Sequence, residues 1–285
     1  MYVAKKSGKN RYHVFDGAVD QFVNTRQETI GQIQIGIKKD QFLLHYQPKI
    51  NIRTGALLGV EALIRWQHPQ RGLLQPKDFL SVIKNHPVSI ELGEWVIKSA
   101  LGQLSLWNSQ NVLIPISVNI DARQLNQHNF IERLKVLLVA CPSFKPGSLE
   151  LEIIETTAIA DTEYAYKIIS ECNALGVLFA LDDFGTGYSS ITYLRYLPIK
   201  TIKIDRSFVC NIDKNPDDLA IVRSLIVLLS SLGRNVIADG VETLEQGEIL
   251  LNIGCELVQG FGFAKPMTVV ELLKWYNQWS GVVQK

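Results

Sequence analysis

Polar side chains that could bind cations or move protons stand near the ends of eight apolar runs in this sequence. They are Gln47, Glu61, Arg65, Asn119, Glu152, Glu155, Asp182, Asp183, Lys203, Asp205, Asp239, Glu242 and Gln259. If the runs are strands of one closed sheet, most of these groups meet at one rim, where several carboxylates would repel one another and lose hydration unless cations compensated them. The candidate ligands are oxygen donors, with no histidine or cysteine among them. The set therefore favours hard ions such as Mg²⁺, Mn²⁺ or Ca²⁺ over Zn²⁺.

The adjacent acids Asp182 and Asp183 indicate more closely which reaction such a site could catalyse. Successive residues of a strand point to opposite faces, so both can reach one site only where the strand ends and the chain turns. Gly185 and Gly187 follow directly and permit such a turn. One aspartate could then bridge two ions, and two ions about 4 Å apart cleave phosphodiesters by activating water and stabilising both reacting oxygens. Lys203 is suited to neutralising charge or orienting that water, so the pattern is consistent with phosphodiester hydrolysis.

The eight runs that would position these residues alternate with helix-like segments. They cover residues 41–50, 57–66, 115–120, 149–154, 177–184, 201–205, 235–241 and 257–263. The segment NIRTG between the first two runs is too short for a crossover helix, which predicts an antiparallel hairpin. Most of the other gaps can hold helices. We therefore predict an α/β fold, a TIM-like (β/α)8 barrel whose first strand runs antiparallel to the rest.

The segment before the barrel divides in two. Residues 1–16 read as a helix end that breaks at Gly8, followed by a short strand without a partner. Residues 17–39 are polar, with sparse apolar residues at helical spacing, and predict a connecting helix. Residues 40–285 would form the barrel domain.

The composition is typical of one large domain without a strong electrostatic field at its surface. Of 285 residues 47% are hydrophobic, and 29 Lys and Arg face 28 Asp and Glu. This balance argues against DNA, RNA or an anionic membrane as a partner. The four cysteines form no CxxC pair, which favours a reducing compartment. With neither a secretory leader nor an apolar stretch of membrane length, we expect a soluble, cytoplasmic chain.

Taken together, the motifs resemble the EAL domain family of cyclic di-GMP phosphodiesterases from about Gln41 to Met267. The matching strings are YQPKI, GVEALIRWQHP, LGEWVI, SVNIDARQL, LELEIIE, LDDFGTGYSSITYLRYLPIKTIKIDRSFV, IADGVET and QGFGFAKPM, in the order of the family. Residues 1–16 are similar to the last helix and strand of a GGDEF domain, the diguanylate cyclase module often fused upstream. The resemblance thus implies a piece of a GGDEF-EAL protein.

The resemblance implies hydrolysis of cyclic di-GMP to linear pGpG with two divalent ions, Mg²⁺ or Mn²⁺, with Ca²⁺ supporting the chemistry poorly. Glu61, Asn119, Glu152 and Asp182 would hold one ion, and Asp182, Asp183 and Asp239 the other. Lys203 and Gln259 would position the attacking water and, with Glu61, Asp182 and Asp183, make up the catalytic set.

The remaining roles concern the ligand and the loop after Asp183. Arg65 would contact a ligand phosphate, because the guanidinium offers a fork of donors. The rest of the expected substrate-binding set is Gln47, Leu63, Asp205, Phe263 and Pro266, the last two as surfaces for a guanine base. Glu155 would anchor the loop and contribute to the surface of a homodimer.

Two positions depart from the family pattern. Asp239 stands where the family usually has glutamate, so its carboxylate would lie roughly 1.5 Å further back unless the strand shifts. This could lower the affinity for the second metal or the rate. Ile154 replaces a common threonine and removes no ligand.

Two other functions compete with hydrolysis of cyclic di-GMP. The shortened acid at Asp239 would suit a weakly active or inactive module that senses the same ligand. A barrel glycosidase could instead use Glu152 or Glu155 with Glu242 as its carboxylate pair, but it would leave Asp182, Asp183 and Lys203 without a role. Asp205 could also be an ordinary ion-pair residue at the rim.

Overall fold

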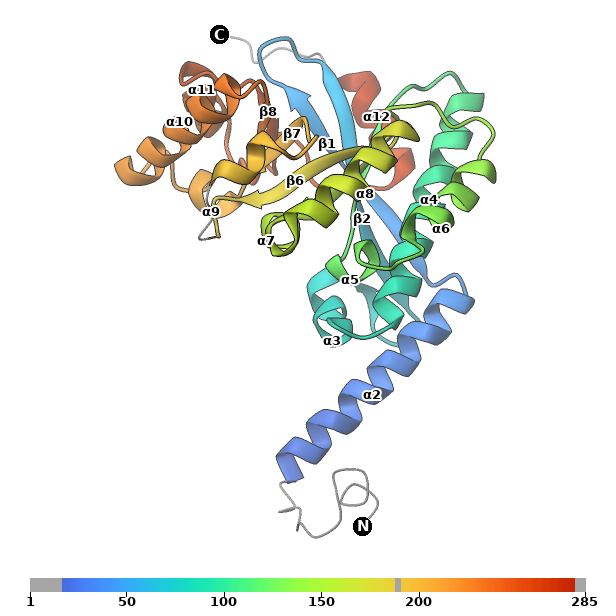
Figure 1. Ribbon diagram of the computed structural model, residues 1–285. Helices are drawn as coiled ribbons and strands as arrows, with labels where there is room; N and C mark the ends of the chain where they lie inside the picture. The colour runs from blue at the N-terminus through green and yellow to red at the C-terminus, as the bar shows by residue number, and fades with distance from the viewer. Residues whose placement is uncertain (1–16, 188–190, 280–285) are drawn as a thin grey trace.

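The centre of the molecule is a closed barrel of eight strands, seen in a computed structural model that describes residues 17–187 and 191–279 (Figure 1). The order around the barrel is β1-β9-β8-β7-β6-β5-β4-β2, and β2 pairs again with β1. The strands are β1 (Phe42–Asn51), β2 (Leu57–His68), β4 (Ile116–Asn119), β5 (Leu149–Ile154), β6 (Leu178–Phe184), β7 (Thr201–Ile204), β8 (Asn235–Ala238) and β9 (Leu257–Gln259). Each predicted run overlaps one of them, so the predicted barrel is confirmed.

β1 is the strand that reverses direction. It pairs antiparallel with both β2 and β9, whereas the neighbouring pairs from β2 round to β9 are parallel. The predicted hairpin and the antiparallel first strand are therefore confirmed. A further strand, β3 (Gly72–Leu74), pairs with the end of β2. The sequence does not predict β3, because three residues carry too little periodicity.

Helices surround the strands in Figure 1. The longer ones are α4 (Val88–Ser109), α6 (Phe130–Val139), α8 (Thr162–Ala174), α10 (Pro216–Ser231), α11 (Leu244–Asn252) and α12 (Val269–Gln278). Short ones follow strand ends, namely α3 (Leu80–Ile83), α5 (Ala122–Leu125), α7 (Glu155–Ala160) and α9 (Arg206–Val209), together with 3-10 turns at Pro76–Asp78 and Ile191–Arg195. The short helices lie beside the rim where the parallel strands end.

The strands are covered on both sides, and the inside of the barrel is partly polar. β5 and β6 carry nearly continuous buried runs, as expected for parallel strands between helices and a barrel interior. Lys49, Glu152 and Lys203 lie among the buried residues, with Glu152 and Lys203 each 1% exposed. Fully buried charged groups require partners, so these residues locate the polar centre of the barrel.

The predicted connecting helix is α2 (Gly17–Lys38), which extends from the barrel on the side of α3 and α4 (Figure 1). Its second half packs tightly, because Ile30 and Ile33 are buried in the core cluster. A Cβ atom at Gly36 would lie 3.0 Å from the Phe42 ring, so the backbone of α2 lies close to that side chain. The resemblance of residues 1–16 to a GGDEF domain lies outside the described residues. No helix among the described residues combines the length and the apolar character needed to span a membrane.

We predict that α2 contributes to the stability of the barrel domain. Ile33→Ala should lower the free energy of unfolding by about 3 kcal/mol, because it removes a fully buried side chain. Ile35→Ala is the matched control on the same helix, since Ile35 is 51% exposed, and should change it by no more than about 0.5 kcal/mol. Urea titrations followed by circular dichroism measure both values. An effect of Ile33→Ala as small as the one expected for Ile35→Ala would show that α2 does not stabilise the folded domain.

Candidate active site at the carboxyl ends of the strands

The acidic residues singled out in the sequence meet at one rim of the barrel. Glu61 comes from β2, Glu152 from β5 and Asp182 from β6, and all three are buried. One carboxylate oxygen of each lies within 4.8 Å of one from each of the others. Asp239 follows the last residue of β8. The expected convergence of these side chains is therefore present.

The ammonium group of Lys203 on β7 lies at the centre of these acids. Its Nζ is 3.0 Å from Glu61 Oε2, 2.9 Å from Glu152 Oε2 and 3.2 Å from Asp182 Oδ2. A fourth carboxylate oxygen, Asp239 Oδ2, is further away at 3.8 Å. We call Lys203 with Glu61, Glu152, Asp182 and Asp239 the central cluster. Its lysine pairs with acids from four different strands or strand ends.

A second lysine lies deeper in the barrel and shares Glu152 with the first. Lys49 Nζ on β1 is 2.6 Å from Glu152 Oε1 and 3.0 Å from Glu150 Oε1. Burial alone would raise the pKa of Glu152, but Lys203 and Lys49 outweigh it and lower the pKa below its usual range. Sequence reasoning missed Lys49. The signal that could have found it is a lysine within a strand that is otherwise buried.

Carboxylates outnumber cations at this rim. Six acids (the four of the central cluster, Asp183, and Glu150, which pairs with Lys49) face two ammonium groups, Lys203 and Lys49, so full ionisation would leave an excess of four negative charges. Burial, together with Glu152, Glu61 and Asp239, raises the pKa of Asp182 to about 7 in spite of Lys203. Burial also raises the pKa values of Asp183 and Asp239.

This donor set fits divalent cations. The buried acids offer hard oxygen donors, and two such ions would offset the excess charge. The Oε1 atom of Gln259 on β9 is buried without a hydrogen-bond partner among the described residues, which leaves a further acceptor free for a ligand or water. Asn119 Nδ2 and Gln259 Nε2 both donate to Glu61, at 2.6 and 2.7 Å, and orient its carboxylate.

The chain turns sharply at Asp183, as the adjacent acids require. Asp183 has a φ of 54°, in the left-handed region, and its N–H donates to Asp182 Oδ1 at 2.9 Å. The pairing between β6 and β7 shifts register between Leu181 and Phe184. Asp183 itself is exposed at the rim, next to Asp205, whose charge adds to the rise in its pKa.

Glu155 lies behind this turn at the start of α7. Its side chain is buried and accepts hydrogen bonds from the Gly185 N–H at 3.0 Å and from the Tyr193 hydroxyl at 2.8 Å. It thereby joins the segments before and after residues 188–190. Glu242, the other acid considered for a glycosidase pair, is half exposed and pairs with Arg206 at 3.6 Å. Glu155 and Glu242 thus have separate surroundings and separate partners.

The residues predicted to bind substrate occupy different surroundings. Gln47 is buried, donates to the Ala264 carbonyl at 3.1 Å and accepts from Gln259 at 3.2 Å. Arg65 is buried and donates to the Ile64 carbonyl at 2.9 Å. Asp205 caps α9 by accepting from the Ser207 N–H at 2.9 Å.

Phe263 and Pro266, the two residues predicted to contact a base, are less exposed than the neighbouring Phe261. Phe263 is partly buried against the core, and a Cβ at Gly247 on α11 would lie 2.8 Å from its ring. Pro266 is half-buried. Phe261 is instead 58% exposed, with Lys265 Nζ 5.9 Å from its ring centroid. Contact of Phe263 with a base stays a prediction.

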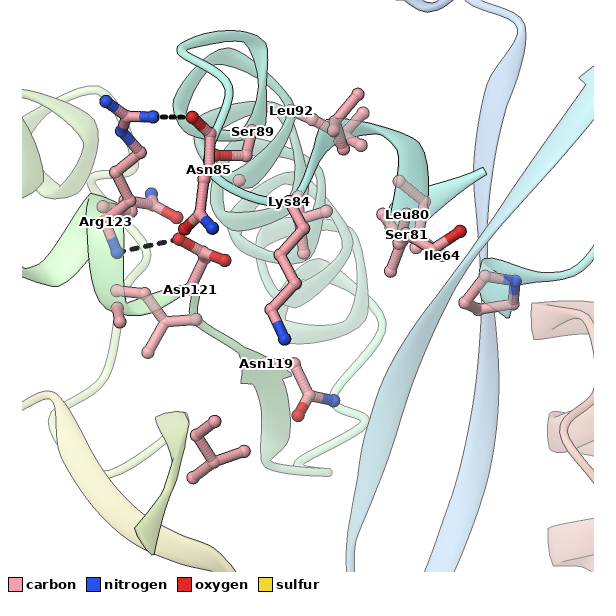
Figure 2. Close-up of a pocket in the computed structure, with 18 of the residues that line it drawn as sticks. Ile64, Leu80, Ser81, Lys84, Asn85, Ser89, Leu92, Asn119, Asp121 and Arg123 are labelled. Carbon is pink, nitrogen blue, oxygen red and sulfur yellow. Dashed lines mark hydrogen bonds between the residues drawn. The ribbon is translucent and has the colours of Figure 1, made fainter. Parts of the chain in front are cut away.

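A cavity of about 490 Å³ opens beside the central cluster, between β2, α3, α4 and α5 (Figure 2). Its lining includes Leu63, which the sequence predicts as a substrate contact, and Asn119, which bonds to Glu61. Most of the other lining groups are apolar, such as Ile64, Leu80 and Ile120. The cavity is large enough for one part of a ligand whose charged part lies at the acids.

Comparison with known proteins agrees with the geometry. The family model described as "EAL domain" matches residues 30–266. The chain is 36% identical over 274 residues to the "Bifunctional diguanylate cyclase/cyclic di-GMP phosphodiesterase MucR" of Pseudomonas aeruginosa, covering 96% of this chain and 40% of that protein. It is 37% identical over 279 residues to the "Cyclic di-GMP phosphodiesterase PdeR" of Escherichia coli, covering 98% of this chain and 42% of that protein. The chain thus spans less than half the length of these relatives.

Solved structures show the same architecture. One described as "PaMucR Phosphodiesterase, c-di-GMP complex" superposes with a TM-score of 0.82 at 37% identity, covering 86% of this chain and 99% of that chain. Another, "Structure of EAL Enzyme Bd1971 - cAMP and cyclic-di-GMP bound form", gives 0.82 at 32% identity, with 91% and 69% covered. The family match extends from the second half of α2 to the end of β9 and beyond, and it includes every residue of the central cluster. The chain therefore belongs to the EAL domain family.

Proposed function

We propose that this domain is a metal-dependent phosphodiesterase that hydrolyses cyclic di-GMP to linear pGpG in bacterial second-messenger signalling. The observation that carries the proposal is the central cluster of buried acids around Lys203 in an EAL domain. The names of MucR and PdeR, and the solved complex of a MucR phosphodiesterase with c-di-GMP, support the choice of substrate. Because that substrate is an intracellular messenger, we propose action in the cytoplasm.

Two divalent ions, Mg²⁺ or Mn²⁺, would be held by this rim, with Ca²⁺ binding but supporting turnover poorly. We assign Glu61, Asn119, Glu152 and Asp182 to one ion and Asp182, Asp183 and Asp239 to the other. When bound, such ions lower the pKa of a coordinated water and stabilise the charge on the reacting oxygens. Lys203 and Gln259 would orient that water, since both already contact Glu61. Lys49 would keep Glu152 ionised for its role as a ligand.

The substrate would lie across the rim, with its phosphates over the acids. The guanidinium of Arg65 interacts electrostatically with Glu61. It would contact one phosphate of the substrate. Gln47, Leu63, Asp205, Phe263 and Pro266 complete the proposed contacts, and the cavity beside Leu63 would receive an apolar face of one base. Glu155 would hold the turn after Asp183 through its bonds to Gly185 and Tyr193.

The arrangement of the whole protein is also part of the proposal. Residues 1–16 would end a fused GGDEF domain, residues 17–39 would connect it, and residues 40–285 would form the EAL phosphodiesterase. The bifunctional name of MucR supports such a fusion. We propose a homodimer, with the loop held by Glu155 near its surface.

Turnover tests the function directly. The purified protein should convert cyclic di-GMP to pGpG with Mg²⁺ or Mn²⁺, and EDTA should abolish the reaction. Asp182→Asn should lower kcat by at least about 100-fold, because it removes an acid assigned to both ions. Asp161→Asn is the control, since Asp161 caps α8 and asparagine caps equally well. Absence of pGpG with either ion would refute the proposal, and formation of pGpG that survives EDTA would refute its dependence on a metal.

Metal binding can be measured apart from chemistry. Mn²⁺ should raise the melting temperature of the wild-type protein, because an ion that binds the folded state relieves the repulsion among its acids. EDTA should reverse the shift, and Asp182→Asn should remove most of it. Differential scanning fluorimetry across Mn²⁺ concentrations gives the comparison. An equal shift in Asp182→Asn would place the ion elsewhere.

A weakly active sensor module is the second candidate, and the position of Asp239 favours it. Its carboxylate is the furthest of the four from Lys203, at 3.8 Å, while its other oxygen accepts from the Gly240 N–H at 2.8 Å. Asp239→Glu would extend the carboxylate by roughly 1.5 Å and should raise kcat about tenfold if the short acid limits the rate. Glu61→Asp, the reverse change on β2, should lower kcat. An unchanged rate in Asp239→Glu would remove the reason for the sensor hypothesis.

A further inference from the structure

One wall of the cavity beside Asn119 is a short, weakly supported segment. Residues 80–85, which we call the cavity wall, comprise α3 and the two residues after it, and five of the six line the cavity. A helix of four residues leaves its last carbonyl groups without partners in the helix. Groups from outside the segment can satisfy them and thereby fix its position.

Arg26 of α2 supplies such a group. Its Nε donates to the Val82 carbonyl at 3.0 Å and its Nη2 donates to the Lys84 carbonyl at 3.3 Å. A guanidinium can bridge two carbonyls because its donors form a rigid fork, which the single ammonium of lysine cannot reproduce. A cation is also favoured at the C-terminal end of a helix. The end of α3 is thus bound to a residue 56 positions earlier in the chain.

The position of Arg26 is set by the same helix face that packs on the barrel. Arg26, Ile30 and Ile33 follow the spacing of one face of a helix, and both isoleucines are buried. In the second half of α2, Gln32 Oε1 lies 3.4 Å from His68 Nε2 on β2. A rotation or shift of α2 would therefore carry the guanidinium of Arg26 away from the cavity wall.

From the cavity side, Arg123 of α5 donates to the Asn85 carbonyl (Figure 2). Asn85 has a φ of 65°, so the chain turns there, and Lys84 before it lines the cavity. In Figure 2 the Lys84 side chain extends in the direction of Asn119, which donates to Glu61 in the central cluster. The cavity wall thus lies between the helix outside the barrel and the proposed metal ligands.

We propose that Arg26 is a positioning residue through which α2 sets the cavity wall and thereby the affinity for the cyclic dinucleotide. The part concerning affinity rests on the proposed function. Movement of α2, imposed by the residues that precede it, would change substrate binding without touching the acids that carry out the chemistry. Such a change alters KM and leaves kcat nearly constant.

The test compares Arg26→Ala, Arg26→Lys and a control, Arg53→Ala. Arg53 is an exposed arginine that pairs with Glu256 at the opposite end of the barrel. In Arg26→Ala, amide hydrogen exchange of residues 80–86 should become faster, and the KM for cyclic di-GMP should rise about fivefold. The kcat should stay within about twofold. Arg26→Lys should recover part of the KM, and Arg53→Ala should match the wild type in both measurements.

The outcomes separate this inference from the proposed function. Unchanged exchange of residues 80–86 in Arg26→Ala would overturn the positioning role, whatever the protein hydrolyses. Faster exchange with an unchanged KM would overturn the link to affinity. If the wild-type protein produced no pGpG, the proposed function would fail, while the exchange experiment would still decide whether Arg26 holds the wall. If Arg26→Ala and Arg53→Ala raised the KM equally, that result would also count against the inference.

Discussion

The interaction on which the rest of this structure depends is the burial of one ammonium group, that of Lys203, among acids from four strand positions. A buried charge is tolerated only when its partners stand at short distances, and here three carboxylate oxygens lie within 3.2 Å of Nζ. Each partner comes from a different strand. A slip of one residue in any of those strands would turn its acid to the other face of the sheet. The geometry of the rim therefore depends on the register of the strands.

Two layers of charge are stacked inside the barrel. Lys49 and Glu150 lie toward the amino ends of the parallel strands, beside a smaller cavity of about 200 Å³. Glu152 joins them to Lys203, because each of its oxygens faces one lysine. The inner layer is nearly balanced, whereas the outer layer holds more acids than its lysine can neutralise. This asymmetry directs the remaining negative charge toward the open end.

The sequence predicted the barrel well, because eight β-branched or apolar runs and one short turn leave few topologies. It also predicted which acids converge, since strand ends of a parallel barrel share a rim. It could not predict Lys49, whose importance depends on a neighbour about 100 positions away, Glu152. Nor could it predict β3 or the cavity, because a short strand and a hollow arise from packing. The role of Arg26 is hidden for the same reason, since nothing in its local pattern distinguishes it from an exposed helix residue.

The reversal of β1 decides where the chain enters the barrel. In an all-parallel barrel the first strand starts at the face opposite the catalytic loops. Here Phe42, the first residue of β1, is paired with Trp66 near the end of β2, so the strand starts at the catalytic face. Any segment joined through α2 would therefore enter on the same side of the barrel as the central cluster. An inverted first strand thus brings α2 to the rim that holds the central cluster without a path through the protein core.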